Sequence, residues 1–169
     1  SFLFSTSNPV YIDWAIKEKK FPIDAALDST GITLLDRATS KLNLPLVKWL
    51  LVQGANPNVE DQKGNTALFY FHDAVGISDK EFFENKIQIW QLLLKHQANI
   101  HHRNKEGSNL LLLASQNIHD PHFAKFYLDK KIDPEEKNSL GDDSSTWLAK
   151  HASKYAGGNF LLDLIEAKG

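Results

Sequence analysis

Apolar residues recur along the chain at the spacing of short, paired helices. In one stretch Leu35, Ala38 and Leu42 fall at helical spacing, and the apolar positions of residues 46–51 form a second such face. Each pair of this length is too small to bury its own apolar surface, so neighbouring pairs must stack to form a core. The pattern predicts an all-α fold of stacked helix pairs.

Polar turns separate the pairs and repeat in phase with them. A turn with a glycine at its fourth position begins at Asp28, recurs 33 residues later at Asp61 and 43 residues after that at Asn104, and ends in a weaker copy at Asn138. A glycine between polar residues is typical of a turn that needs positive φ. The sequence therefore contains an internal repeat rather than a series of unrelated helices.

A second motif closes each repeat, and together the two motifs carry a family resemblance. Two leucines followed by a Gly-Ala-Asn turn occupy residues 50–58, with related segments at 93–101 and 127–134. A glycine turn, Thr-x-Leu at a helix start, a mid-helix alanine and this closing turn resemble the ankyrin-repeat family, whose period is 33 residues. The resemblance covers residues 28–169 and implies a solenoid of helix-turn-helix units with short hairpin loops and degenerate end caps.

The repeat boundaries predict the organisation of the whole chain. The expected segments are an N-terminal tether and capping helix over 1–27, an ankyrin repeat over 28–60, a repeat with an insertion over 61–103, a repeat over 104–137 and a capping repeat over 138–169. In the caps, helices are expected from Pro9 to Lys20, from Thr146 onward and from Phe160 to Ala167.

The chain departs from the family pattern at two kinds of position. Thr-Pro-Leu-His, which the family usually shows at the first helix, keeps its threonine and second leucine in most copies but loses proline and histidine. Gly54 ends the second helix of the first full repeat, whereas Gln97 and Lys131 replace it later. Those two turns are expected to be either strained or reshaped.

About ten residues are inserted in the second repeat, between Tyr70 and Ile87. One interpretation is a longer helix with a tolerated loop, in which Phe82 and Phe83 pack on the stack. The other is a binding element, because insertions in solenoids often lie on the binding face. On the second interpretation, deleting Val75–Glu84 leaves the fold intact and removes most of the affinity for a partner.

Composition narrows the classes of function. The net charge of −2 gives no support for a nucleic-acid-binding domain, and no apolar run approaches the length of a membrane span. Cysteine is absent, which removes disulfides and thiolate chemistry. The chain does not begin with methionine, and its apolar, then Ser/Thr/Asn-rich start favours a processed periplasmic or secreted protein slightly over a trimmed cytosolic one.

No group of residues in the sequence supports catalysis or metal binding. His101 and His102 are adjacent and would point to opposite faces, and His119 and His122 have no obvious third ligand. Glu135 and Glu136 are expected on an exposed hairpin tip. Because the tip is exposed, the pKa of their carboxyl groups is not expected to be raised. The chain is predicted not to be an enzyme and to use no cofactor and no metal.

The predicted function is therefore to bind a specific folded protein. The ankyrin resemblance implies contact through hairpin tips and the inner face of the first helices, and the insertion and nearby charges extend that surface. The candidate partner-binding residues are Ser29, Thr30, Ile32, Ser40, Lys41, Glu60, Gln62, Lys63, Asn65, Asp73, Phe82, Phe83, Arg103, Lys105, Glu106, Ser108, Gln116 and Asn117.

Two forms of this function remain open. By analogy with short, degenerate ankyrin proteins, the chain resembles a bacterial inhibitor or immunity protein that neutralises a cognate toxin or effector enzyme. The alternative is a scaffold or targeting fragment of a larger effector or enzyme. Exposed charges are expected at Lys63, Lys105 and Arg103. Reversing all three is expected to lower the affinity for the partner without unfolding the chain.

Overall fold

The computed structural model describes residues 9–18, 20–72, 80–116, 121–151 and 163. Within these ranges the chain forms helices and no strand. The helices are α1 (Pro9–Glu18), α2 (Leu34–Ser40), α3 (Leu44–Val52), α4 (Ala67–His72), α5 (Lys80–Lys95), α6 (Leu110–Gln116), α7 (Pro121–Asp129) and α8 (Ser144–His151). The predicted all-α repeat fold is confirmed. The chain divides into two compact units, Ser1–Asn99 and Ile100–Gly169, which are described separately below.

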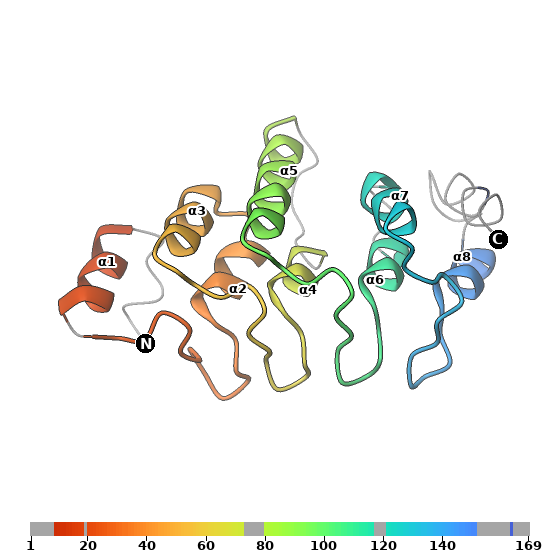
Figure 1. Ribbon diagram of the computed structural model, residues 1–169, viewed down its shortest axis with the longest axis horizontal. Helices are drawn as coiled ribbons and strands as arrows, with labels where there is room; N and C mark the ends of the chain where they lie inside the picture. Colours follow the sequence, from red (N-terminus) through yellow and green to blue (C-terminus); the bar gives the residue numbers. More distant parts are fainter. Residues whose placement is uncertain (1–8, 19, 73–79, 117–120, 152–162, 164–169) are drawn as a thin grey trace. The chain divides into compact units, whose positions relative to one another are not determined.

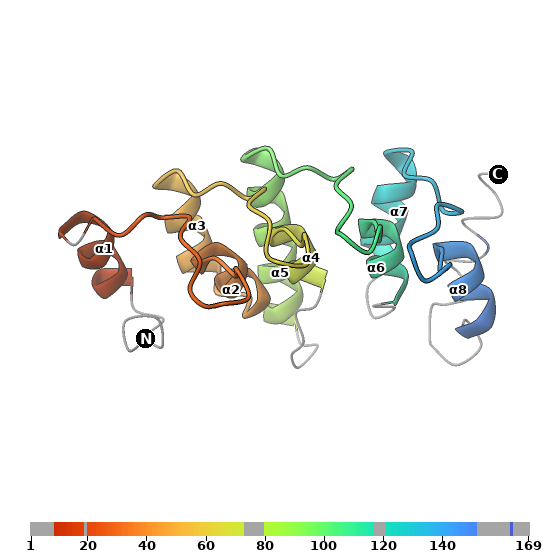
Figure 2. The same cartoon turned by 90° about the horizontal axis from the view of Figure 1, so that it is seen from below.

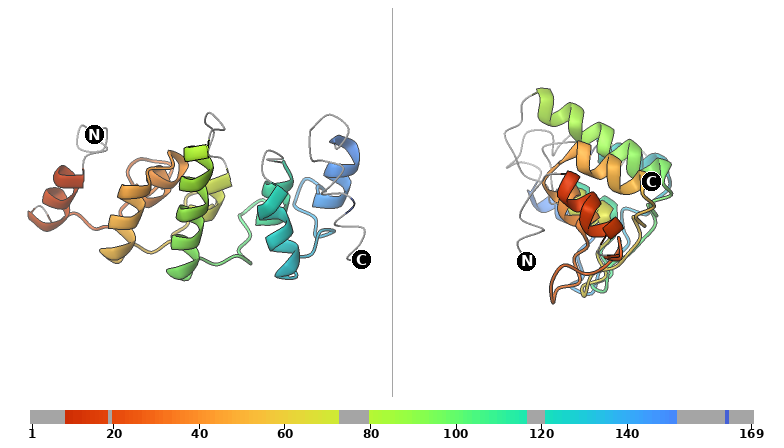
Figure 3. Two further views of the ribbon diagram at one scale, coloured as in Figure 1. Left: turned by 90° about the horizontal axis from the view of Figure 1, so that it is seen from above. Right: turned by 90° about the vertical axis from the view of Figure 1, so that its left-hand side faces the viewer.

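In the first unit, two full repeats stack as two layers of helices. The first helices α2 and α4 pack against each other, and the second helices α3 and α5 form the outer layer (Figures 1 and 3). The loops that precede α2 and α4 project from the inner layer, away from α3 and α5 (Figure 1). Residues 28–33 and 61–66 of these loops are called the first and second hairpin loops.

Polar residues at the helix starts explain where α2 and α3 begin. Thr33 and Asp36 form a capping box on α2, in which each side chain accepts a hydrogen bond from the other residue's backbone N–H. The Asn43 side chain accepts from the N–H of Leu46 at the start of α3. Leu42 does not continue the α2 face as the spacing predicted, because α2 ends at Ser40 and Leu42 lies in the following turn with φ of 49°.

The core of the first unit comes from equivalent positions of the two repeats. Leu35 and Leu68 are buried in the inner layer, and Leu50 and Leu93 are buried in the outer layer. Each of these side chains projects from a helix that packs against the equivalent helix of the other repeat. The repeat-to-repeat stacking inferred from the short helices therefore supplies the buried apolar surface.

The closing turns keep one backbone shape although their residues differ. Gly54 has φ of 93°, and Gln97 and Lys131, which replace it, have φ of 65° and 62°. Of the two expected outcomes, the structure therefore shows strained turns rather than reshaped ones, because residues with a Cβ disfavour this left-handed region. Hydrogen bonds stitch neighbouring turns together: Asp24 accepts from the N–H of Asn56, and Asn58 accepts from the N–H of Asn99.

The second repeat differs from the first in its interior. Phe71 and His72, at the end of α4, are buried where the first repeat has Ala38 and Thr39. Lys86 of α5 is only 4% exposed, and its ammonium lies 5.1 Å from the centre of the Phe71 ring. α5 has 16 residues and α3 has 9, so part of the insertion lengthens the second helix.

The second unit contains α6, α7 and α8, with α6 packed against both of the others. The Asn109 side chain accepts from the N–H of Leu112 at the start of α6. Asp143 does the same for Thr146, so α8 begins at Ser144, two residues earlier than expected. Asp143, which caps this helix, is buried. The helix expected from Phe160 to Ala167 lies outside the described residues, apart from Asp163.

Candidate protein-binding surface

The hairpin loops of the first unit expose side chains at their tips. Ser29 and Thr30 of the first hairpin loop and Gln62 and Lys63 of the second are exposed, as the sequence predicted. Figure 2 shows the first unit from the side on which these loops project. The backbone N–H of Gln62 donates to the carbonyl oxygen of Thr30 at 2.9 Å. Neighbouring tips are therefore fixed to each other while their side chains face solvent.

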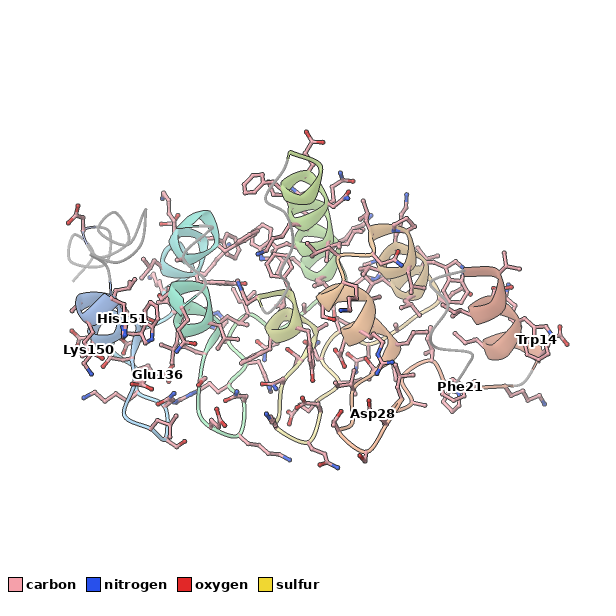
Figure 4. The ribbon with its side chains drawn as sticks, turned by 180° about the vertical axis from the view of Figure 1, so that it is seen from behind. Trp14, Phe21, Asp28, Glu136, Lys150 and His151 are labelled. Carbon is pink, nitrogen blue, oxygen red and sulfur yellow. The ribbon has the colours of Figure 1, made fainter. Side chains whose placement is uncertain are left out.

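An acidic residue organises each of these tips from within. The Asp28 carboxylate accepts from the N–H and the hydroxyl of Thr30, and these hydrogen bonds lower the pKa of Asp28. Figure 4 marks Asp28 on the first hairpin loop. Burial raises the pKa of Asp61, but hydrogen bonds led by that from Tyr70 outweigh this effect and leave the pKa below its usual value. Both carboxylates thus fix the loop backbone, and these hydrogen bonds favour their ionised form.

Gly31 permits the close approach of the two loops. Its φ is 86°, and a Cβ at this position would meet the backbone N of Gln62 at 3.1 Å. A side chain here would disturb the hydrogen bond between the tips. The glycine of the repeated turn therefore has two roles, since it supplies positive φ and leaves room for the neighbouring loop.

The second unit has the same arrangement in residues 104–109 and 138–143, called the third and fourth hairpin loops. Asn104 and Asn138 replace aspartate, and their side-chain oxygens accept from loop N–H groups. The N–H of Ser139 donates to the carbonyl oxygen of Glu106 at 2.7 Å. Lys105 and Glu106 are exposed at the tip, as predicted.

Two predicted contact residues have structural roles in the second unit. Ser108 is only 6% exposed, and its hydroxyl accepts from the Asn138 side chain, so it does not belong to an exposed surface. Arg103 contacts Glu136 at 2.7 Å and donates to the carbonyl oxygens of Gly107 and Lys137. Figure 4 marks Glu136. The guanidinium thus links the third hairpin loop to residues 136–137, so reversing Arg103 is expected to cost stability. That the chain tolerates this reversal without unfolding stays a prediction.

The remaining predicted residues have mixed positions. Lys41, Glu60 and Gln116 are exposed, and Ile32, Ser40 and Asn65 are half-buried. Phe83 is 37% exposed, and the Phe82 side chain lies outside the described residues. Asp73 and Asn117 also lie outside the described residues, as do residues 75–79 of the insertion, so the role of the insertion in binding stays a prediction.

One exposed residue of the fourth hairpin loop was missed. Leu140 is 74% exposed and occupies the loop position that Lys63 and Glu106 occupy in the second and third loops. The repeat pattern contained this signal, because the weak copy at Asn138 aligns the three positions. An exposed leucine at a hairpin tip adds an apolar contact to an otherwise polar set.

The described part of the chain also bears on metal binding and on membrane insertion. There, no cluster of three or more histidine, cysteine, aspartate or glutamate side chains is arranged to hold a metal ion. In the same residues, every helix is too short or too polar to cross a bilayer. Of the expected carboxylate pair, Glu135 is exposed, whereas Glu136 pairs with Arg103 and accepts from the Asn109 side chain.

Stacked helix pairs joined by projecting hairpin loops define a helical-repeat protein. The model of ankyrin repeats in three copies matches residues 34–138. The chain therefore belongs to the ankyrin-repeat family, as the turn and closing motifs predicted. Ankyrin repeats are generally protein–protein interaction modules.

The similar curated proteins come from a virus of amoebae. The chain is 34% identical over 113 residues to the putative ankyrin repeat protein L91 of Acanthamoeba polyphaga mimivirus, covering 65% of the chain and 18% of that protein. It is 38% identical over 64 residues to the putative ankyrin repeat protein L92 of the same virus, covering 38% of the chain and 13% of that protein. The chain thus spans under a fifth of these relatives. Neither comparison supports a bacterial origin or a role in toxin immunity.

Proposed function

We propose that this chain is a non-catalytic module that binds a folded protein through its hairpin tips. In each unit the surface consists of exposed tip side chains, including Gln62 and Lys63 in the first unit and Lys105 and Glu106 in the second. The observation that supports the proposal is the hydrogen bonding between neighbouring tips. A tip that is already ordered loses little conformational entropy when a partner binds.

The polar character of the tips favours a partner of complementary charge and shape. Most tip side chains are charged or carry hydroxyl or amide groups, and Leu140 adds an exposed apolar contact. Charged rims of this kind determine specificity and association rate more than total affinity. The interiors of the second and third hairpin loops, by contrast, are occupied by the hydrogen bonds of Asp61 and Asn104, which leaves the tip side chains for a partner.

Quantitative capture experiments test this proposal. Immobilised chain is exposed to an extract of cells from its source, and retained proteins are identified by mass spectrometry. The variant Lys63→Glu with Lys105→Glu is expected to lose a partner that the wild-type chain retains. Lys150→Glu on α8 is the control for charge reversal, because it makes one lysine-to-glutamate change on an exposed helix away from the hairpin tips. Arg103 is left unchanged because of its structural role.

The outcomes separate the forms of this function. Equal retention by the hairpin variant and the control would contradict a hairpin-tip interface. If the captured partner is an enzyme, an assay of its activity with and without the chain distinguishes neutralisation from scaffolding. A partner whose activity is unchanged supports the scaffold or targeting form.

A further inference from the structure

The outer layer of the first unit contains a groove that the hairpin surface does not include. It lies between α3 and α5, which run side by side (Figure 3), and has a volume of about 330 Å³. The lining residues are Leu44, Lys48, Gln88, Gln91, Leu92 and Lys95. The groove is on the layer opposite α2 and α4, away from the first and second hairpin loops (Figure 1).

The groove is built from two facing helical stripes. On α5 the four lining residues are spaced at i, i+3, i+4 and i+7, which places them on a single face. On α3 the two lining residues are spaced at i and i+4 and share a face as well. This spacing means that adjacent side chains of each helix line the groove together over about two turns of α5.

The side chains give the groove an apolar floor and a basic, polar rim. Leu44 and Leu92 are half-buried, whereas Lys48 and Lys95 and both glutamines are exposed. None of the described residues that line the groove is acidic. Among the described residues, neither lysine has an ion-pair or hydrogen-bond partner. Lys17, in contrast, pairs with a carboxylate on its own helix.

We propose that this groove binds an acidic linear peptide segment of a partner protein. An aliphatic side chain of the peptide rests on Leu44 and Leu92, and carboxylates on either side of it pair with Lys48 and Lys95. The glutamine amides supply both donors and acceptors for the peptide backbone. Charge complementarity favours this occupant, because two lysines that have no ion pair among the described residues line the groove together with the two leucines.

The size and composition of the groove disfavour other occupants. Its volume is at the lower end for ligand sites, which suits a few side chains of an extended segment. Binding of a nucleic-acid backbone needs many neighbouring cationic side chains. This groove has two lysines, in a chain of net charge −2. The leucine floor would leave a phosphate backbone against apolar surface.

Nuclear magnetic resonance titration locates the binding directly. The uniformly ¹⁵N-labelled chain is titrated with a short synthetic peptide that alternates glutamate and leucine. Saturable shifts are expected for amides of residues 44–48 and 88–95. A peptide that alternates lysine and leucine is the charge-swapped control and should not bind. Raising the salt concentration should weaken binding of the glutamate peptide, since the proposed ion pairs are exposed.

Variants connect the shifts to the two lysines. The double variant Lys48→Glu with Lys95→Glu is expected to lower the affinity for the peptide at least tenfold, or by about 1.4 kcal/mol of binding free energy. Lys48→Gln with Lys95→Gln should weaken it less, and this pair also serves if the reversed variant is poorly folded. Lys150→Glu makes a single lysine-to-glutamate change on the exposed face of α8 and should bind as the wild type does.

Three results would overturn the proposal. They are the absence of saturable shifts at the groove, equal affinity in both lysine variants, and equal binding of an RNA oligonucleotide at the same amides. The proposal does not depend on the hairpin-tip function, and the two are tested by different variants. Lys63→Glu with Lys105→Glu should retain the peptide, and the groove variant should retain a partner captured through the tips.

Discussion

The first full repeat, residues 28–60, and the second, residues 61–103, share turn motifs but have different interiors. Where the first repeat has the small Ala38 against its neighbours, the second buries Phe71. Where the first repeat has Thr39, the second buries His72. The second helix of the first repeat has 9 residues, and that of the second has 16.

These differences belong together physically. A phenylalanine at the end of α4 has more apolar surface to cover than an alanine, and the longer α5 supplies covering residues. Lys86 comes from the lengthened helix, is buried, and places its ammonium against the Phe71 ring. The comparison shows that an insertion can be coupled to a change in the core and is not only an added loop.

The largest expected effect is at Phe71. Phe71→Ala gives the second repeat the residue of the first, but leaves the longer α5 above a cavity and removes the ring from Lys86. The loss of stability is expected to be about 3–5 kcal/mol. Chemical denaturation measures it, and Phe71→Leu is the milder control. A loss below about 1 kcal/mol would mean that α5 closes over the site, as α3 does in the first repeat.

The outer helices should differ in their sensitivity to truncation. Leu51 of α3 is buried, whereas the equivalent Leu94 of α5 is half-buried. Leu51→Ala is expected to cost about 2–5 kcal/mol, and Leu94→Ala less. Thermal melts followed by circular dichroism compare the two variants. Equal losses would show that the two leucines are buried alike in solution.

A buried titratable residue on each inner helix, Asp36 on α2 and His72 on α4, should make the stability of the chain change with pH in opposite directions. Burial raises the pKa of Asp36 in the first repeat to about 6, because it outweighs the hydrogen bonds from Thr33. Burial, with a contribution from Lys86, lowers the pKa of His72 in the second repeat to about 3. As pH falls from 7 to 5, the folded chain takes up a proton at Asp36 and gains stability. Over the same interval only the unfolded chain protonates His72, so stability is lost.

Single variants separate the two contributions. Asp36→Asn removes the gain, so stability should fall between pH 7 and 5 by about 1–2 kcal/mol more than in the wild-type chain. His72→Gln removes the loss, and its stability should fall less or rise over the same interval. Denaturant midpoints at several pH values give both slopes. Parallel slopes for the two variants and the wild type would contradict the assigned pKa shifts.

The smallest expected effect is at the closing turns. Gln97 adopts φ of 65° where its counterpart Gly54 has φ of 93°. Gln97→Gly removes the steric cost of the Cβ in the left-handed conformation and is expected to raise the stability of the chain by up to about 1 kcal/mol. The carbonyl oxygen of residue 97, which accepts from Asn58, is unchanged by the substitution. A melting temperature at or below that of the wild-type chain would show that the Gln97 side chain stabilises the chain by more than its left-handed conformation costs.

Most of the fold could be predicted because it depends on local spacing. The glycine turns, the threonine caps and the leucine faces each act over a few residues, and the 33-residue period placed them in register. The exposed tips at Lys63 and Lys105 followed from the same register. Leu42 was assigned wrongly, because its spacing fits a helix although the chain turns there with positive φ.

The sequence by itself determined the repeat, the family and the order of helices, since periodicity decides which face of each element is apolar. Only the tertiary structure decided which polar residues are structural and which are exposed. Ser108 is hydrogen-bonded by Asn138, thirty residues away, and Arg103 pairs with Glu136, which precedes the fourth hairpin loop. The groove between α3 and α5 likewise exists only when two repeats stack. These properties depend on residues far apart in sequence, whose distances no local pattern records.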